Sequence, residues 1–121
     1  MNVSEMDKNI VLRIRKYCCE IKGFTAGFDY PAFEQVLQMN RATIFTLEQI
    51  GECVKKLSED FRKTYNHIPW QEIMGLRNRI AHDYDGIYLD VVWETATEDI
   101  PKLRDDLRLI LEELGNGDID S

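Results

Sequence analysis

Residues 76–84, which read LRNRIAHDY, gather side chains that could carry out chemistry within one short segment. Arg77 offers a forked, permanently charged set of donors that matches phosphate oxygens. His82 titrates near neutral pH and can accept or donate a proton. Asn78 can orient either group through hydrogen bonds. These residue types fit metal-independent cleavage of an RNA phosphodiester, because the 2′-hydroxyl of RNA is the nucleophile and arginine stabilises the charged phosphorus centre.

The same residues also have a simpler interpretation. Arg77 and Arg79 could be solvated surface groups, and His82 could interact favourably with a helix dipole. Tyr84 could be half-buried with its hydroxyl group in water. Arg77 and His82 are five positions apart, which on a continuous helix turns the second about 140° away from the first. The two side chains can cooperate only if the helix ends near His82 or if a second subunit supplies one of them.

Other catalytic arrangements have little support in the sequence. His67 and His82 lie on either side of an expected helix and lack the spacing of a zinc site. The serines lie outside any nucleophile motif, and no glycine-rich phosphate loop occurs. We therefore expect neither a bound metal nor a cofactor.

The acidity of the chain is concentrated in its C-terminal quarter. The net charge is −7, yet residues 94–121 hold nine acids and three bases, whereas residues 1–93 are almost balanced. Broad, non-specific binding to phosphate is therefore not expected, while a local basic groove is compatible with this distribution. The length of 121 residues suits one domain spanning residues 1–121, with an acidic, frayed tail from about residue 115.

Several features predict a cytoplasmic protein that does not enter a membrane. No apolar run approaches the roughly 18 residues of a membrane span, and the N-terminus mixes charged and apolar residues unlike a signal peptide. The three cysteines, Cys18, Cys19 and Cys53, are an odd number with an adjacent pair, which is a poor disulfide framework. We expect them to be reduced thiols.

Apolar residues at helical spacing predict an all-α fold, an antiparallel bundle of four main helices with one or two short extra helices. The first helix should follow Ser4, with an inward stripe of Ile10, Val11, Ile14, Cys18 and Ile21. Gly23 and Gly27 bracket the next break. Asp29 is expected to cap the segment that follows, with Pro31 in its first turn.

A long stripe then predicts one amphipathic helix over residues 32–61, or two joined by a kink near Met39 and Asn40; its members are Ile44, Leu47, Ile50, Gly51, Val54, Leu57 and Phe61. A close contact between helices would explain Gly51 in its middle.

The C-terminal half predicts a helix from Pro69 to Tyr84, a turn at Gly86 and a short helix over residues 89–96. Asp99 should cap the last helix, with Pro101 in its first turn and Leu103, Leu107, Ile110, Leu111 and Leu114 inward. The segment GIYLDVVW has the composition of a strand, but an isolated strand has no partner.

The segment RNRIAHDY resembles the motif of arginine, four residues, histidine, one residue and tyrosine in the HepT-like proteins of the HEPN superfamily. The flanking segments IPW, GIYLDVVW and DIPKL are similar to that family too, and the likeness spans residues 5–114. It implies an all-α homodimer that acts as a metal-independent ribonuclease toxin. The implied antitoxin is a minimal nucleotidyltransferase of the MntA type, in a prokaryotic toxin–antitoxin pair resembling type VII.

The resemblance also implies roles for individual residues. The catalytic arginine and histidine of the family fall on Arg77 and His82, and its polar residue falls on Asn78. The motif tyrosine falls on Tyr84, which would accept AMP from the antitoxin and thereby block the site. Arg79 is a further candidate for contacting RNA, and either tRNA or mRNA would fit as substrate. The alternative is a bundle with little catalytic activity that serves as a scaffold for the nucleotidyltransferase.

Two acids depart from the usual pattern of the family. Asp83 and Asp85 flank Tyr84, where many members have less charged residues. Carboxylates near His82 would raise its pKa and repel RNA. We therefore expect weaker or more selective cleavage than in members with neutral residues there.

Overall fold

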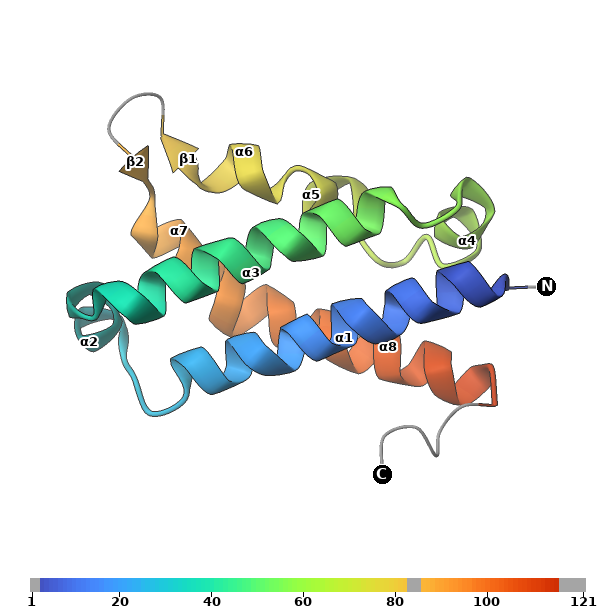
Figure 1. Ribbon diagram of the computed structural model, residues 1–121, viewed down its shortest axis with the longest axis horizontal. Coiled ribbons are helices and arrows are strands. Elements are labelled where there is room, and N and C mark those ends of the chain that lie inside the picture. Colours follow the sequence, from blue (N-terminus) through green and yellow to red (C-terminus); the bar gives the residue numbers. More distant parts are fainter. Residues whose placement is uncertain (1–2, 83–85, 116–121) are drawn as a thin grey trace.

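The computed structural model describes residues 3–82 and 86–115, with the backbone alone at residues 81, 82, 86 and 87. Four helical segments form the predicted antiparallel bundle (Figure 1). They are α1 (Glu5–Thr25), α3 (Leu37–Lys55), α5 (Trp70–Met74) followed by α6 (Leu76–Ile80), and α7 (Leu89–Glu94) continued by the π turn η1 (Thr95–Asp99) and α8 (Ile100–Glu113). The short α2 (Tyr30–Gln35) and α4 (Glu59–Thr64) are the extra helices, and the all-α prediction is confirmed.

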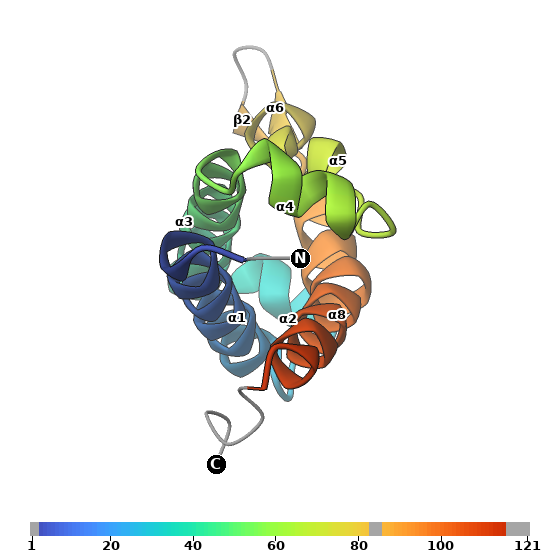
Figure 2. The same ribbon diagram turned by 90° about the vertical axis from the view of Figure 1, so that its right-hand side faces the viewer.

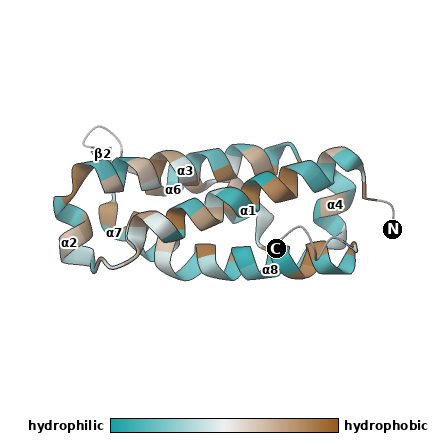
Figure 3. Ribbon diagram, turned by 60° about the horizontal axis from the view of Figure 1, so that its bottom comes forward, coloured by the Kyte–Doolittle hydropathy of each residue, from teal (hydrophilic) through white to brown (hydrophobic). Residues whose placement is uncertain are grey.

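The helices surround a core built from the predicted stripes. Figure 2 looks along the bundle, with α1, α3, α5 and α8 arranged around its axis. Figure 3 shows hydrophobic and hydrophilic residues alternating along α1 and α3, as expected for helices buried on one side. Every predicted inward residue of the three stripes is buried except Ile44 and Leu114, which are partly buried.

The predicted caps of the first two helices are confirmed. The Oγ of Ser4 accepts a hydrogen bond from the backbone N–H of Asp7 at 3.0 Å. The carboxylate of Asp29 accepts one from the N–H of Ala32 at 2.9 Å. Such side chains satisfy N–H groups that have no partner within the helix. The break lies at Gly27, which has a φ of 80°, whereas Gly23 lies within α1.

The predicted single helix over residues 32–61 is wrong, because the chain breaks at Val36 and again at residues 56–58. The alternative of two helices joined near Met39 and Asn40 is wrong in position, because both residues lie within α3. The second break has a long-range cause. The buried carboxylate of Asp7 accepts hydrogen bonds from the backbone N–H and the Oγ of Ser58, at 2.8 and 2.7 Å. Ser58 in turn caps α4 by accepting from the N–H of Phe61. The apolar stripe continues across the break because Leu57 and Phe61 both remain buried.

Asp99 does not cap the last helix, contrary to prediction. It has helical backbone angles and makes no side-chain cap bond, so residues 89–113 form one continuous helical segment. Pro101 explains the π turn before it. Proline has no N–H, and its ring would clash with the carbonyl four residues earlier in an α-helix. The wider turn, in which the N–H of Ile100 bonds to the carbonyl of Thr95, relieves that clash.

Gly51 marks a close approach of α3 to α5, as predicted. A Cβ atom at this position would lie 3.0 Å from the backbone carbonyl oxygen of Ile73. Because the obstacle is backbone, it cannot rotate away as a side chain could. The absence of a side chain at residue 51 thus lets α5 and α6 pack against α3.

We expect Gly51→Leu to lower the free energy of unfolding by about 2 kcal/mol, because overpacking of a close contact costs more than the helix propensity gained. The matched control is Gly23→Leu in α1, where an added Cβ meets nothing within 4 Å. That variant should be as stable as wild type or more so. Urea denaturation followed by circular dichroism measures both, and a Gly51→Leu variant at least as stable as wild type would contradict this contact.

Candidate active site

The helix α6 presents the polar residues of the motif on its outer surface. Leu76 and Ile80 are one turn apart and buried, at 2% and 0% exposure. They therefore fix the inward face of the helix. Arg77, Asn78 and Arg79 lie between them and are exposed. Two buried anchors thus position three polar side chains on the outside of the bundle.

The helix ends at Ile80 and does not continue to Tyr84 as predicted. The carbonyl of Ile80 accepts a hydrogen bond from the N–H of Tyr88 at 2.9 Å. The chain then forms two short antiparallel strands, β1 (Ala81–His82) and β2 (Gly86–Ile87), in which His82 pairs with Gly86. These strands lie beyond the end of α6 at the edge of the molecule (Figure 1). The segment GIYLDVVW therefore contributes a two-residue strand before it enters α7.

This ending changes the relation between Arg77 and His82. The rotation of about 140° applies only to a continuous helix, and here the helix stops two residues before the histidine. A helical rise to Ile80 and an extended rise to His82 separate the two positions by on the order of 11 Å along the chain. The helix end near His82, one of the two arrangements that permit cooperation, is thus present. Tyr84 and the flanking Asp83 and Asp85 lie outside the described residues.

Arg77 lies on the flank of α6 that faces α3. Lys55, which donates a hydrogen bond of 2.8 Å to Glu52, lowers the pKa of the Glu52 carboxyl, and the charges of Arg77 and Lys56 lower it further. The positive charges of Arg77, Lys55 and Lys56 therefore share one surface with the carboxylate of Glu52.

Arg79 lies on the opposite flank, facing the π turn. Its guanidinium group is 3.5 Å from the carboxylate of Asp99, and both side chains are about half exposed. Residues two positions apart on a helix point about 200° apart, which explains why Arg77 and Arg79 diverge. Arg79 therefore pairs with Asp99 and points to the opposite side of α6 from Arg77.

A groove of about 750 Å³ runs between α5–α6 and η1–α8. Its lining includes residues of the HIP segment over 67–69, Arg79, Thr95, and residues of the DIPKL segment over 99–103. Sequence analysis did not anticipate this groove, because periodicity shows which side of each helix faces inward but not where two helices part. The sequence signal for the groove was the pair of segments that resemble the family, IPW and DIPKL. Only the fold shows that these two segments lie on either side of one groove.

The profile of the family described as "Ribonuclease HepT-like" matches residues 14–110. This chain belongs to the HepT-like ribonuclease family. The expected family and the ribonuclease class of enzyme are thereby confirmed.

Several relatives are similar along most of their length. This HepT-like chain is 37% identical over 107 residues to a candidate RNase of Methanocaldococcus jannaschii, covering 88% of this chain and 92% of the relative. It is 34% identical over 114 residues to another candidate RNase of that organism, covering 94% of each. It is 41% identical over 84 residues to a candidate ribonuclease HepT of Thermococcus cleftensis, covering 69% of this chain and 76% of the relative. No solved structure matches the chain.

The described part of this HepT-like protein fits neither a membrane-spanning helix nor a metal-ligand cluster. No helix in residues 3–82 and 86–115 has the length and apolar character needed to cross a membrane. Within the same part of the chain, no three His, Cys, Asp or Glu residues cluster as metal ligands would. Cys18 and Cys53 are buried free thiols and Cys19 is an exposed one.

Proposed function

We propose that this protein is a metal-independent endoribonuclease toxin of a prokaryotic toxin–antitoxin pair, which acts as a homodimer and is silenced by a minimal nucleotidyltransferase. The observation that carries the proposal is the exposure of Arg77 and Asn78 on a helix that leads directly into the strand bearing His82. Membership of the HepT-like ribonuclease family supports the same reaction class.

In the proposed reaction each motif residue has one role. Arg77 binds the scissile phosphate and stabilises the charge that develops at phosphorus. His82 takes the proton from the 2′-hydroxyl or supplies one to the leaving 5′-oxygen. The new bond joins the 2′-oxygen to phosphorus while the bond from phosphorus to the 5′-oxygen breaks. Asn78 orients the reacting groups.

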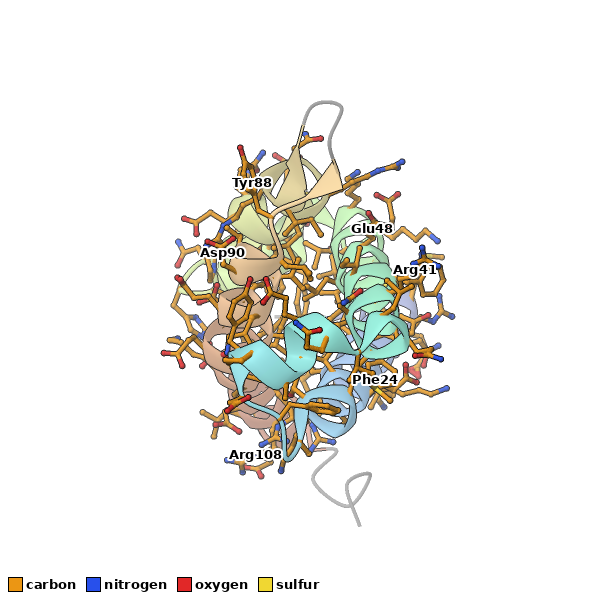
Figure 4. All side chains as sticks on the ribbon, turned by 90° about the vertical axis from the view of Figure 1, so that its left-hand side faces the viewer. Phe24, Arg41, Glu48, Tyr88, Asp90 and Arg108 are labelled. Carbon is orange, nitrogen blue, oxygen red and sulfur yellow. The ribbon has the colours of Figure 1, made fainter. Side chains whose placement is uncertain are left out.

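The outer face of α3 supports association of two copies. Leu37 and Phe45 are exposed at 53% and 60%, which is unusual for large apolar side chains on a monomer surface. Arg41 and Glu48 lie on the same face, because residues three or four positions apart on a helix are neighbours. Figure 4 shows both charged side chains projecting from α3 on one flank of the molecule.

The charges on this face are arranged for self-association. Arg41 and Glu48 are equally distant from a point between residues 44 and 45 of α3. Two α3 helices packed antiparallel about a two-fold axis at that point place Arg41 opposite the partner subunit's Glu48, and the reverse. Burial of Phe45 would supply the affinity, while the charge pairs would set the register.

Such a dimer would also assemble the site. Arg77 lies on the flank of α6 that faces α3, close enough to Glu52 to lower its pKa. Glu52 is two helical turns from Phe45 on the same side of α3. A second copy seated on this face would bring another Arg77 and His82 to one cleft. The cleft would then concentrate positive charge that the net charge of −7 conceals.

AMP transfer to Tyr84 is the proposed off switch. The motif tyrosine follows His82 by two residues, so AMP on its hydroxyl would stand beside the catalytic pair. Its negative phosphate would repel the incoming RNA backbone, and its bulk would occlude the cleft.

We expect His82→Ala and Arg77→Ala each to lower the rate of RNA cleavage at least about 100-fold in the presence of a chelator, because they remove proton transfer and charge stabilisation. The control is Arg108→Ala. Arg108 lies on α8, remote from the motif, and its guanidinium group is 3.0 Å from the carboxylate of Glu112. This variant should cleave as wild type does. Gel analysis of purified protein with total RNA measures the rates, and circular dichroism checks folding. A folded wild type that binds a nucleotidyltransferase but cleaves no RNA would favour the scaffold alternative.

We expect Phe45→Glu to convert the dimer to a monomer and to lower cleavage, because it places a charge at the two-fold axis. Leu109→Glu is the matched control, since Leu109 is 55% exposed on α8. Sedimentation velocity measures the oligomeric state. Arg41→Glu should weaken the dimer, and adding Glu48→Arg should restore it. Dimers that survive Phe45→Glu, or a charge reversal that rescues nothing, would refute this interface.

We expect incubation with the nucleotidyltransferase and ATP to add the mass of one adenylyl group per protomer and to abolish cleavage. Tyr84→Phe should prevent the addition, whereas Tyr88→Phe should not, although Tyr88 is 46% exposed only four residues away. Intact-protein mass spectrometry reads both results. Labelling of Tyr84→Phe at wild-type levels would move the modification to another residue.

A further inference from the structure

The groove between α5–α6 and η1–α8 has no role in the reaction proposed above. Its volume of about 750 Å³ lies in the range of small-ligand sites. The floor is apolar, formed by side chains with at most 8% exposure, namely Ile68, Ile73, Leu76, Ile100 and Leu103. A flat apolar group could therefore enter it and be stacked or packed on this floor.

Thr95 is a buried polar residue in the lining of this groove. It is 1% exposed, and its Oγ1 has no hydrogen-bond partner among the described residues. A helical threonine commonly bonds to the carbonyl four residues back. Thr97 does so, at 2.8 Å from the carbonyl of Trp93. Leaving a buried hydroxyl unpaired is unfavourable. Thr95 therefore brings an unsatisfied, buried hydroxyl group to the wall of the groove, in a π turn of the kind often found at functional sites.

The rim of the groove carries both signs of charge. Arg79 pairs with Asp99 at 3.5 Å, and Lys102 pairs with Asp106 at 3.1 Å. Glu72 adds a third carboxylate. Carboxylates outnumber the permanent cations, so the rim is poorly suited to a phosphate, and a carboxylate that pairs with one cation keeps further acceptor sites. It suits a neutral ligand that displays hydrogen-bond donors and acceptors at its edge.

We propose that this groove binds one unstacked base of the RNA substrate, a base that bears an exocyclic amino group. The inference rests on the proposed ribonuclease function and names a specificity site for it. A nucleobase is flat and apolar on its faces, with polar groups along its edge, and proteins commonly read RNA by holding splayed bases in such pockets. The rim carboxylates accept hydrogen bonds from amino groups. Adenine, cytosine and guanine carry one, whereas uracil does not.

The position of the groove relative to Arg77 fits this use. Arg77 and Arg79 stand on opposite flanks of α6, which is about 10 Å across with its side chains. A strand whose phosphate is held at Arg77 can therefore cross α6 and place the base of a neighbouring nucleotide in the groove. This arrangement would couple the choice of base to the site of cleavage.

The test is titration of isotope-labelled protein with adenosine, cytidine, guanosine and uridine, followed by NMR chemical shifts. These probes lack phosphate, so binding does not depend on Arg77. We expect shifts at Thr95 and along the groove, with at least threefold weaker affinity for uridine. Thr95→Val, which keeps the shape but removes the hydroxyl, should weaken binding of the other three at least threefold.

Neighbouring acids provide a matched pair of variants. Asp106→Asn changes a carboxylate in the lining of the groove and should reduce the discrimination against uridine at least twofold. Asp105→Asn makes the same change at the next residue, which lies outside the lining and is 58% exposed, and should bind as wild type does. In parallel, sequencing of fragments from a random RNA pool should show a base preference that Asp106→Asn weakens and Asp105→Asn keeps.

The outcomes separate this inference from the ribonuclease proposal. Groove-centred shifts in a protein that cleaves no RNA would support base binding and overturn the nuclease. Cleavage without any groove shift, equal affinity for uridine, or shifts confined to the surface around Arg77 would overturn the base site and leave the nuclease standing. The base site would also be overturned if the groove residues shifted on addition of the nucleotidyltransferase but not on addition of any nucleoside.

Discussion

The burial of Leu76 and Ile80 is the constraint on which the candidate site depends. These two side chains hold a helix of five residues against the bundle, and everything exposed between them belongs to the motif. The helix is too short to be stable alone. Its position comes from packing, and the glycine at residue 51, which lets α5 come within contact of α3, permits that packing. The position of the motif at the surface therefore depends on a contact in the core.

The divergence of Arg77 and Arg79 gives α6 two flanks with different surroundings. One flank faces α3 and continues into an outer face that is apolar and charge-complementary to itself. The other faces the π turn and borders a groove with an apolar floor. A single turn of helix thus separates the place where a second copy would complete the catalytic cleft from the place where a base would be read. In the proposed scheme, Arg77 and Arg79, which are two positions apart, would serve different tasks.

Charge at the site depends on local arrangement more than on the total. The chain is acidic overall, and its excess of acids lies in the C-terminal quarter. The surface around Arg77 holds Lys55 and Lys56 with Glu52 between them. Exposed ion pairs contribute little to stability, so the ion pairs on α8 matter mainly for the charge distribution on its surface. The basic surface next to α3 and the mixed rim of the groove are separate environments on one small molecule.

The sequence alone determined the helical character of the chain, the inward stripes, the caps at Ser4 and Asp29, and the residue types of the motif. These features are local, because periodicity and capping act over a few residues. Only the tertiary structure decided that a helix breaks at Ser58, because the cause is Asp7, 51 residues away. It also decided that α6 stops at Ile80, whose carbonyl accepts from the N–H of Tyr88, the residue after β2. Neither wall forms the groove by itself, so the groove exists only because the fold places α5–α6 beside η1–α8.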